Sequence, residues 1–203
     1  TYVSRTTNSG NNWQNYNLPV QCFSRQVRFV NNNTGYVFGA SIDSAYVFKS
    51  VNGGLDWEIV IRLGGQSNTM QVIDQDNVLL CMVNKIHKTT NGGASWSFKP
   101  INSGLYTDMQ FLNQETGYVC GNLGRVFATT NSGDNWVQLG SPVTELLYDL
   151  VFLPSSPQTG FICGFNGKIL KTTNGGALSI NQISSEVPSG YALSQNYPNP
   201  FNP

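Results

Sequence analysis

A short motif occurs five times in the 203-residue chain, and the copies align without gaps. Each copy is a strand-like segment followed by an Asn-Gly or Asn-Ser-Gly turn, and a tryptophan closes the first four copies. The turn asparagines follow one another at intervals of 39 to 44 residues: Asn8, Asn52, Asn91, Asn131 and Asn174. A period near 40 residues accommodates four short strands per unit, so the chain is a repeat protein built from strands.

The rest of the unit repeats as well. An apolar strand, a turn and a second strand come before each of the last four motifs, as in Asp149 to Leu153 followed by Gly160 to Gly164. A single four-stranded sheet cannot bury both of its faces, so neighbouring units must stack. We therefore predict an all-β fold, a β-propeller of four-stranded antiparallel blades with four complete blades and one partial blade, residues 1–16.

The turn of the motif has a composition that suits a tight hairpin. Asparagine can accept hydrogen bonds from nearby backbone N–H groups, and glycine adopts positive φ without a steric cost. The tryptophan begins the fourth strand and can fold back over the hairpin. We predict structural roles in these turns for the following residues: Asn8, Gly10, Trp13, Asn52, Gly54, Trp57, Asn91, Gly93, Trp96, Asn131, Gly133, Trp136, Asn174 and Gly176.

The composition argues against some classes of binding partner. Charged residues make up 11% of the chain, and the formal net charge is zero. No basic stripe of the kind that nucleic-acid binding needs is present. No run approaches the 18 or so apolar residues of a membrane-spanning helix. We expect no nucleic acid, no membrane span and no cofactor. Because Thr1 leads directly into strand-like sequence, we expect either a removed leader or a start within a longer protein.

Four octets resemble a known repeat. They are TTNSGNNW (Thr6 to Trp13), SVNGGLDW (Ser50 to Trp57), TTNGGASW (Thr89 to Trp96) and TTNSGDNW (Thr129 to Trp136). They are similar to the Asp-box, or bacterial neuraminidase repeat, with asparagine at the Asp position. The larger unit, GYVCG…GRVFATTNSGDNW, resembles propellers of the photosystem II assembly and stability factor type over about residues 1–180. That resemblance implies about seven blades, with closure by five as the alternative, and it implies little about function.

The C-terminal residues carry a different signal. The repeats stop after Ile183, so we predict a propeller over 1–183, a linker over 184–189 and a separate tail over 190–203. The segment LSQNYPNPFNP (Leu193 to Pro203) resembles the start of the C-terminal sorting domain of type IX secretion. The resemblance implies contact with that secretion machinery and export across the outer membrane, to the medium or the cell surface. A Pro-rich linker is the alternative.

Few residues suggest chemistry. Asp108 and Asp149 begin the first strand of adjacent units, at a position that Gln26 and Thr69 occupy in the others. Two facing carboxyls are what glycoside hydrolysis needs, but a structural role repeated from unit to unit is favoured. The single histidine, His87, aligns with mostly apolar residues, which favours a packing role over a catalytic base. We therefore predict no catalytic residue, with Asp108 and Asp149 as weak candidates.

Three further patterns give weaker predictions. The four cysteines of an exported protein suggest disulfides, but equivalent positions in neighbouring blades are too far apart, so free buried thiols are favoured. No C-x-x-C occurs, and we predict no metal site. Ser44, in the sequence SIDSA, is a candidate O-glycosylation site on a loop expected to be exposed. A column of cations across the repeats is expected to lie on solvated strand faces: Arg5, Lys49, Lys88 and Lys171, with Ala128 as the exception.

Three functions are compatible with these observations. The first is a secreted or cell-surface binding and scaffold module without catalysis, whose loops bind a protein or glycan. The second is a carbohydrate-active hydrolase, sialidase-like or another propeller glycosidase. The third is a structural subunit of an extracellular assembly, a homo-oligomer or filament that docks through blade faces or an edge strand.

Overall fold

A computed structural model describes residues 1–176 and 181–184 of the chain. Within these residues the chain forms eighteen strands and two single-turn 3-10 helices. The strands form one two-stranded sheet and four four-stranded sheets, all antiparallel. The strands of each sheet follow one another as a simple meander. The prediction of an all-β propeller with four complete blades and one partial blade is confirmed.

The five sheets are numbered as blades 1 to 5 in chain order. Blade 1 consists of β1 (Tyr2–Arg5) and β2 (Gln14–Asn17). Blade 2 consists of β3 (Phe23–Phe29), β4 (Gly35–Ala40), β5 (Ser44–Ser50) and β6 (Glu58–Gly64). Blade 3 consists of β7 (Ser67–Val72), β8 (Val78–Met82), β9 (Lys85–Thr89) and β10 (Ser97–Pro100).

The last two blades each include a short 3-10 turn between their second and third strands. Blade 4 consists of β11 (Tyr106–Phe111), β12 (Gly117–Gly121), η1 (Asn122–Gly124), β13 (Val126–Thr129) and β14 (Val137–Leu139). Blade 5 consists of β15 (Leu147–Leu153), β16 (Ser156–Gly164), η2 (Phe165–Gly167), β17 (Ile169–Thr172) and β18 (Asn181–Ser184).

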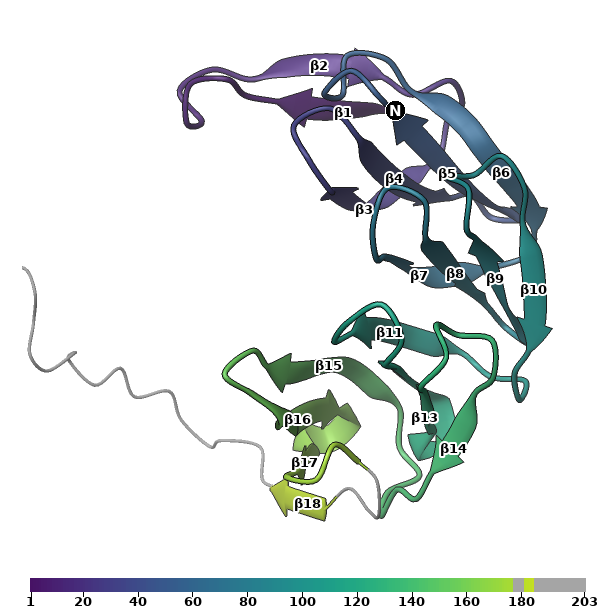
Figure 1. The fold of residues 1–203 in the computed structure, drawn as a ribbon, viewed down its shortest axis with the longest axis vertical. Helices are drawn as coiled ribbons and strands as arrows, with labels where there is room; N and C mark the ends of the chain where they lie inside the picture. The colour runs from purple at the N-terminus through teal and green to yellow at the C-terminus, as the bar shows by residue number, and fades with distance from the viewer. Residues whose placement is uncertain (177–180, 185–203) are drawn as a thin grey trace, which may run out of the picture.

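The blades follow one another along an open arc (Figure 1). The first strands of blades 2 to 5, which are β3, β7, β11 and β15, lie on the inner side of the arc, and β6, β10 and β14 lie toward its outer side. Consecutive inner strands lie beside one another, β7 next to β11 and β11 next to β15. Gln26 on β3 and Asp108 on β11 each bond the backbone of the next blade.

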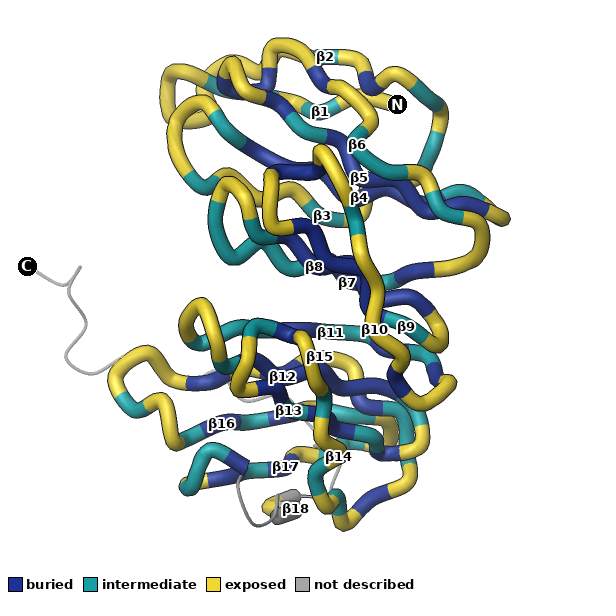
Figure 2. The backbone as a smooth tube through the Cα atoms, turned by 45° about the vertical axis from the view of Figure 1, so that its right-hand side comes forward, coloured by how far each residue is buried: buried dark blue, intermediate teal, exposed yellow. Residues whose placement is uncertain are grey.

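The hydrophobic core lies in the seams, which are the contacts between consecutive blades. In the seam of blades 2 and 3, Tyr36 and Phe38 pack against Met70 and Leu80, and equivalent clusters fill the other three seams. Because both faces of a blade are covered, the central strands β4, β8 and β12 are buried along their whole length, as the dark tube in Figure 2 shows. Such strands read as continuous apolar runs instead of alternating ones.

The first four Asn-Gly turns are held by the same set of side-chain bonds, and the described part of the fifth repeats the threonine bonds. In blade 3 the Thr89 hydroxyl donates to Oδ1 of Asn91 at 3.0 Å and accepts from the Gly93 N–H at 2.9 Å. Oδ1 of Asn91 also accepts from the Ser95 N–H at 2.9 Å. The second glycine has positive φ throughout, and at Gly133 a Cβ would lie 2.7 Å from the side chain of Leu79. The turn therefore needs glycine both for its backbone and for the close approach of the preceding blade.

The turn tryptophans differ in one respect. Nε1 of Trp57 donates to the carbonyl of Gly54 at 3.1 Å, and Trp13 and Trp136 make the same bond in their own turns. Nε1 of Trp96 instead donates to the carbonyl of Val60, on the last strand of blade 2. Trp96 thus ties blade 3 to its neighbour, whereas the other indoles close their own hairpins.

The column of cations does not lie on solvated strand faces, so that expectation is wrong. Nζ of Lys49 donates to the carbonyl of Gly92 at 2.9 Å, and Nζ of Lys88 lies 3.1 Å from Oδ1 of Asp134. Both acceptors belong to the Asn-Gly turn of the following blade. Only 8% of Lys88 is exposed. The sequence could not indicate this role because the acceptor of each cation lies about one repeat further along the chain.

Candidate binding site on the loop face

The two ends of the blades differ in chemistry. One end carries the Asn-Gly turns. The other end, called the loop face, carries the turns between second and third strands (41–43, 83–84, 122–125 and 165–168) and the connections between blades (18–22, 65–66, 101–105 and 140–146). Antiparallel meander topology places these two sets of loops at opposite ends of every sheet. The predicted turn residues lie at the first of these ends, and Asp108, the weak catalytic candidate, lies between two blades.

Asp108 bridges two blades. Its Oδ2 accepts a hydrogen bond from the Leu150 N–H of blade 5 at 3.0 Å, and Oε1 of Gln26 accepts from the Met70 N–H of blade 3 at 2.7 Å in the same way. Burial, and then the charge of nearby Asp149, raise the pKa of Asp108 above its usual range. The bond from Asp108 to the backbone of the next blade, which repeats the bond of Gln26, favours a structural bridge between blades.

The structure shows the surroundings of the four cysteines and of Ser44, the candidate glycosylation site. All four cysteines, which lie within the described residues, are free thiols; Cys81 and Cys120 are buried, and Cys163 is exposed. Burial raises the pKa of Cys120 to about 12, so this thiol is not an activated nucleophile. Ser44 begins β5 and is 3% exposed, so the expected exposure of this candidate glycosylation site is wrong. The central position of β5 between β4 and β6 explains its burial.

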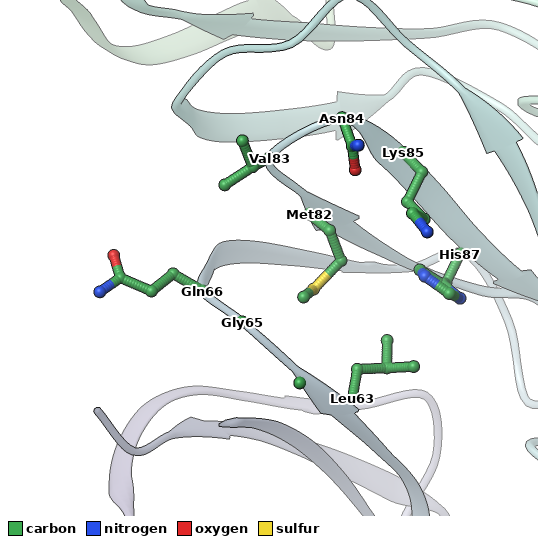
Figure 3. A pocket seen from close by; sticks show the side chains of 9 residues that line it. Leu63, Gly65, Gln66, Met82, Val83, Asn84, Lys85 and His87 are labelled. Atoms are coloured by element: carbon green, nitrogen blue, oxygen red, sulfur yellow. The ribbon is translucent and has the colours of Figure 1, made fainter. Parts of the chain in front are cut away.

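A cavity of about 450 Å³ opens on the loop face where blade 2 leads into blade 3. It lies between the end of β6 and the turn from β8 to β9 (Figure 3), and its lining consists of Leu63, Gly64, Gly65, Gln66, Met82, Val83, Asn84, Lys85 and His87. Two consecutive glycines leave this connection without side chains over the cavity. No atom lies within 4 Å of the position that a Cβ on Gly64 would take, and Gly65 has a φ of +99°.

A backbone bond joins the turn to the preceding connection in blades 4 and 5. In blade 4 the Asn122 N–H donates to the carbonyl of Leu105 at 2.8 Å, and in blade 5 the Phe165 N–H donates to the carbonyl of Leu146 at 2.7 Å. Among the described residues, no such bond joins Val83 to Gln66, which occupy the corresponding positions in blade 3. The short Gly-Gly connection therefore leaves this turn uncovered, and the cavity results.

The polar wall of the cavity is formed by β9. His87 is 9% exposed and packs against Phe98, with 5.6 Å between the ring centroids. Burial, and then the charge of Lys85, lower the pKa of His87, so its imidazole is neutral at pH 7. Nζ of Lys85 lies 4.7 Å from the centroid of the Phe98 ring. The wall thus offers one cation and one neutral imidazole, while Leu63 and Met82 supply an apolar surface.

The loop face also carries two rows that sequence reasoning missed. A cation occupies the position just after the turn in three blades: Lys85, Arg125 and Lys168. Lys168 pairs with Glu145 at 3.4 Å. Exposed apolar side chains sit in the turns themselves, at Ile42, Val83, Leu123 and Phe165. In each row the residues stand at a similar sequence distance from their turns, and this spacing could have indicated both rows.

The described residues contain neither a metal-binding cluster nor a membrane-spanning helix. No cluster of three or more His, Cys, Asp or Glu side chains could hold a metal ion there. In the same part of the chain, no helix is long and apolar enough to cross a membrane.

Comparison with known proteins identifies the family. The family model described as photosynthesis system II assembly factor YCF48 matches residues 5–137, well over half of the chain. The chain belongs to this family. No curated protein matches the sequence. The family match agrees with the resemblance that the octets and the GYVCG unit indicated in the sequence.

Solved structures share the fold. YCF48 bound to D1 peptide is 16% identical, with a TM-score of 0.54 over 81% of this chain and 82% of that one. An ancestral GH74 enzyme is 22% identical, with a TM-score of 0.63 over 80% of this chain but 24% of its own length. The GH74 enzyme of Niastella koreensis is 14% identical, with a TM-score of 0.63 over 79% and 30%. These likenesses support the propeller fold alone.

The family corrects the predicted cellular location. Export to the medium or the cell surface is contradicted, because the YCF48 family is one of photosystem II assembly factors and not of secreted surface proteins. That prediction rested on the tail over 190–203 and its likeness to a sorting domain. The tail and most of the predicted linker lie outside the described residues.

Proposed function

We propose that this YCF48-family chain is a non-catalytic binding module whose loop-face cavity holds an extended segment of a partner protein. The observation that carries the proposal is the cavity of about 450 Å³ beside a turn that lacks the sealing bond of blades 4 and 5. The Val83 N–H and the Gln66 carbonyl are a donor and an acceptor that a peptide backbone complements. Recognition by added main-chain bonds is common in peptide binding.

The side chains around the cavity support the same ligand class. Leu63 and Met82 provide an apolar surface for a ligand side chain, and methionine adapts its shape to different partners (Figure 3). Asn84 and Gln66 can both donate to and accept from peptide groups. The exposed apolar side chains of neighbouring turns, Leu123 and Ile42 among them, extend the surface beyond the cavity. A similar propeller, YCF48, has been solved with a D1 peptide bound.

A blocking substitution tests this proposal. Full-length chain would be screened against a labelled D1 peptide and a library of random linear peptides, and binding would be measured by fluorescence anisotropy. Gly64→Trp adds a bulky side chain at the lining of the cavity, from a Cβ position with no atom within 4 Å. Gly140→Trp is the matched control, since Gly140 is equally open and does not line the cavity.

We expect Gly64→Trp to weaken binding about tenfold or more, which corresponds to about 1.4 kcal/mol, and Gly140→Trp to leave it unchanged. Equal affinity of the two variants would place the ligand elsewhere. Failure of the screen to yield any peptide would overturn the assignment to peptide binding.

A glycoside hydrolase is the second candidate. It is supported by the fold shared with GH74 enzymes and by the carboxyl pair Asp108 and Asp149 on the inner strands. Incubation of the full chain with plant and bacterial polysaccharides, followed by measurement of reducing ends, tests it. A hydrolase would release reducing ends, and Asp108→Asn would abolish their release. The binding-module proposal predicts no release by either protein.

A further inference from the structure

A second cavity lies at the opposite end of the blades, in the seam of blades 4 and 5, and it is independent of the proposed function. Its volume is about 410 Å³, and its lining consists of Tyr118, Ala128, Thr129, Thr130, Asn131, Asn135, Val137, Leu139, Gln158, Asn174, Gly175 and Gly176. Most of these residues belong to two consecutive Asn-Gly turns and the strands beside them. No acidic or basic side chain is among them.

The other three seams carry a cation at the equivalent place. Lys49 reaches from the third strand of blade 2 to the Gly92 carbonyl at 2.9 Å, and Lys88 reaches from blade 3 to Asp134 at 3.1 Å. The guanidinium of Arg5 lies beside Gly53 in the seam of blades 1 and 2. Blade 4 has Ala128 at this position, one methyl group where its neighbours have a long cationic chain. The cavity therefore lies where a long cationic side chain, a lysine or an arginine, lies in the other seams.

The seam of blades 2 and 3 indicates what chemistry holds such a cation. Within the described residues Lys49 forms no ion pair; its ammonium group has the Gly92 carbonyl at 2.9 Å and the Tyr36 ring, whose centroid is 5.6 Å away. A carbonyl oxygen and an aromatic face are a recognised pair of contacts for an ammonium ion. The carboxylate of Asp76 also lies near, with Oδ1 3.5 Å from the position that a Cβ on Gly92 would take, and Gln158 carries a neutral acceptor near the corresponding glycine of the seam of blades 4 and 5.

The seam of blades 4 and 5 has a glycine and a tyrosine at the same two positions, but the tyrosine hydroxyl bonds differently, because Tyr36 donates to the Gln75 carbonyl. Gly175 occupies the place of Gly92, and Tyr118 occupies the place of Tyr36. The Tyr118 hydroxyl donates to the Gly175 carbonyl at 2.6 Å, which leaves the second lone pair of that oxygen for another donor. Oε1 of Gln158 lies near Gly175, within 2.9 Å of where a Cβ would be, and adds a second neutral acceptor.

From these equivalences we propose that the cavity binds the primary alkylammonium group of a ligand, in the pose that a lysine at position 128 would adopt. Polyamines and lysine side chains both present this group on a flexible alkyl chain of suitable length. Val137 and Leu139 line the cavity and would contact the alkyl portion. The ammonium group would donate to the Gly175 carbonyl and to Gln158.

The test uses n-butylammonium chloride, which has the four carbons and the ammonium group of a lysine side chain, one carbon more than Ala128 lacks. The thermal unfolding midpoint of the full chain would be measured against its concentration, with tetramethylammonium chloride at equal ionic strength as the matched salt without N–H donors. Ala128→Lys supplies the tethered ammonium, and Ala128→Met fills the cavity without a charge. Lys49→Ala creates a second cavity of the same kind in another seam.

We expect n-butylammonium, but not tetramethylammonium, to raise the midpoint of the natural chain, and its apparent affinity to fall about tenfold or more in Ala128→Lys and Ala128→Met. Lys49→Ala should respond more strongly than the natural chain. An equal response of the natural chain and Ala128→Met would overturn the proposal, as would equal effects of the two salts. Titration with spermidine and with Nα-acetyl-lysine methylamide then distinguishes the two sources by which binds more tightly.

Discussion

Thr69 is the position where this structure makes its sharpest stability prediction. The side chain lies on β7, is 0% exposed, and its Oγ1 is the buried side-chain atom within the described residues that has no hydrogen-bond partner. Gln26 and Asp108, at the same position of other blades, reach backbone N–H groups of the next blade. Threonine is shorter than either side chain and does not reach across the seam.

Valine has nearly the shape of threonine and no hydroxyl. Burying an unpaired hydroxyl costs about 1–3 kcal/mol in mutational data. We therefore expect Thr69→Val to increase the free energy of unfolding by about 1–2 kcal/mol, which corresponds to a rise of about 2–8 °C in the unfolding midpoint for a protein of this size. Both residues are β-branched, so the strand itself is unaffected.

Thr89→Val is the matched control because it makes the same chemical change at an equally buried threonine. The Thr89 hydroxyl donates to Asn91 and accepts from the N–H groups of Asn91 and Gly93, and the last of these is buried. Loss of the acceptor leaves a buried N–H unsatisfied, at a cost of about 1–3 kcal/mol. The same substitution should therefore have opposite signs at positions 69 and 89.

Thermal unfolding followed by far-ultraviolet circular dichroism and by tryptophan fluorescence provides the assay. Agreement of the two probes establishes that one cooperative transition is being compared. A lower midpoint for Thr69→Val, or equal shifts for the two variants, would refute the reasoning that an unpaired hydroxyl, and not the threonine shape, sets the energy at position 69.

Two further predictions concern pH. The pKa of His87 is lowered in the folded chain, so its contribution to stability is present above the unfolded value of about 6.5 and is lost as the pH falls below it. His87→Gln should therefore make the unfolding midpoint depend less on pH between pH 7 and pH 5. An unchanged pH dependence would contradict this. The pKa of Asp108 is raised, so its contribution is present below about pH 4 and is lost as the pH rises through the folded value. Asp108→Asn keeps the acceptor for Leu150 and should raise the midpoint at pH 7 but not at pH 3, as a pH series of melting curves would reveal.

The repeats made the fold predictable from sequence. The Asn-Gly turns, the tryptophans and the apolar second strands recur at a fixed period, and each is a local feature whose physics is contained in one repeat. The equivalence of Gln26, Thr69, Asp108 and Asp149 on the inner strand was predicted in the same way, and the register of the strands agrees with it.

Contacts between repeats were harder to predict. Lys49 and Lys88 find their acceptors in the next blade, so the column alone could not distinguish a solvated face from a seam. The loop-face cavity depends on the shortness of the connection at Gly65 and on the lack of a bond between Val83 and Gln66, and neither leaves a motif in the sequence. His87 was judged from its apolar equivalents, which predicted its packing on Phe98 but not the cavity it borders.

Amide hydrogen exchange with and without bound peptide tests the central claim most directly. If the loop-face cavity holds the ligand, saturation with a selected peptide will slow exchange at residues 65–67 and 83–85, where the connection and the uncovered turn meet. Exchange in the five Asn-Gly turns will stay the same. Protection confined to those turns, or absent from both segments in a chain that binds the peptide, would contradict the assignment of the site.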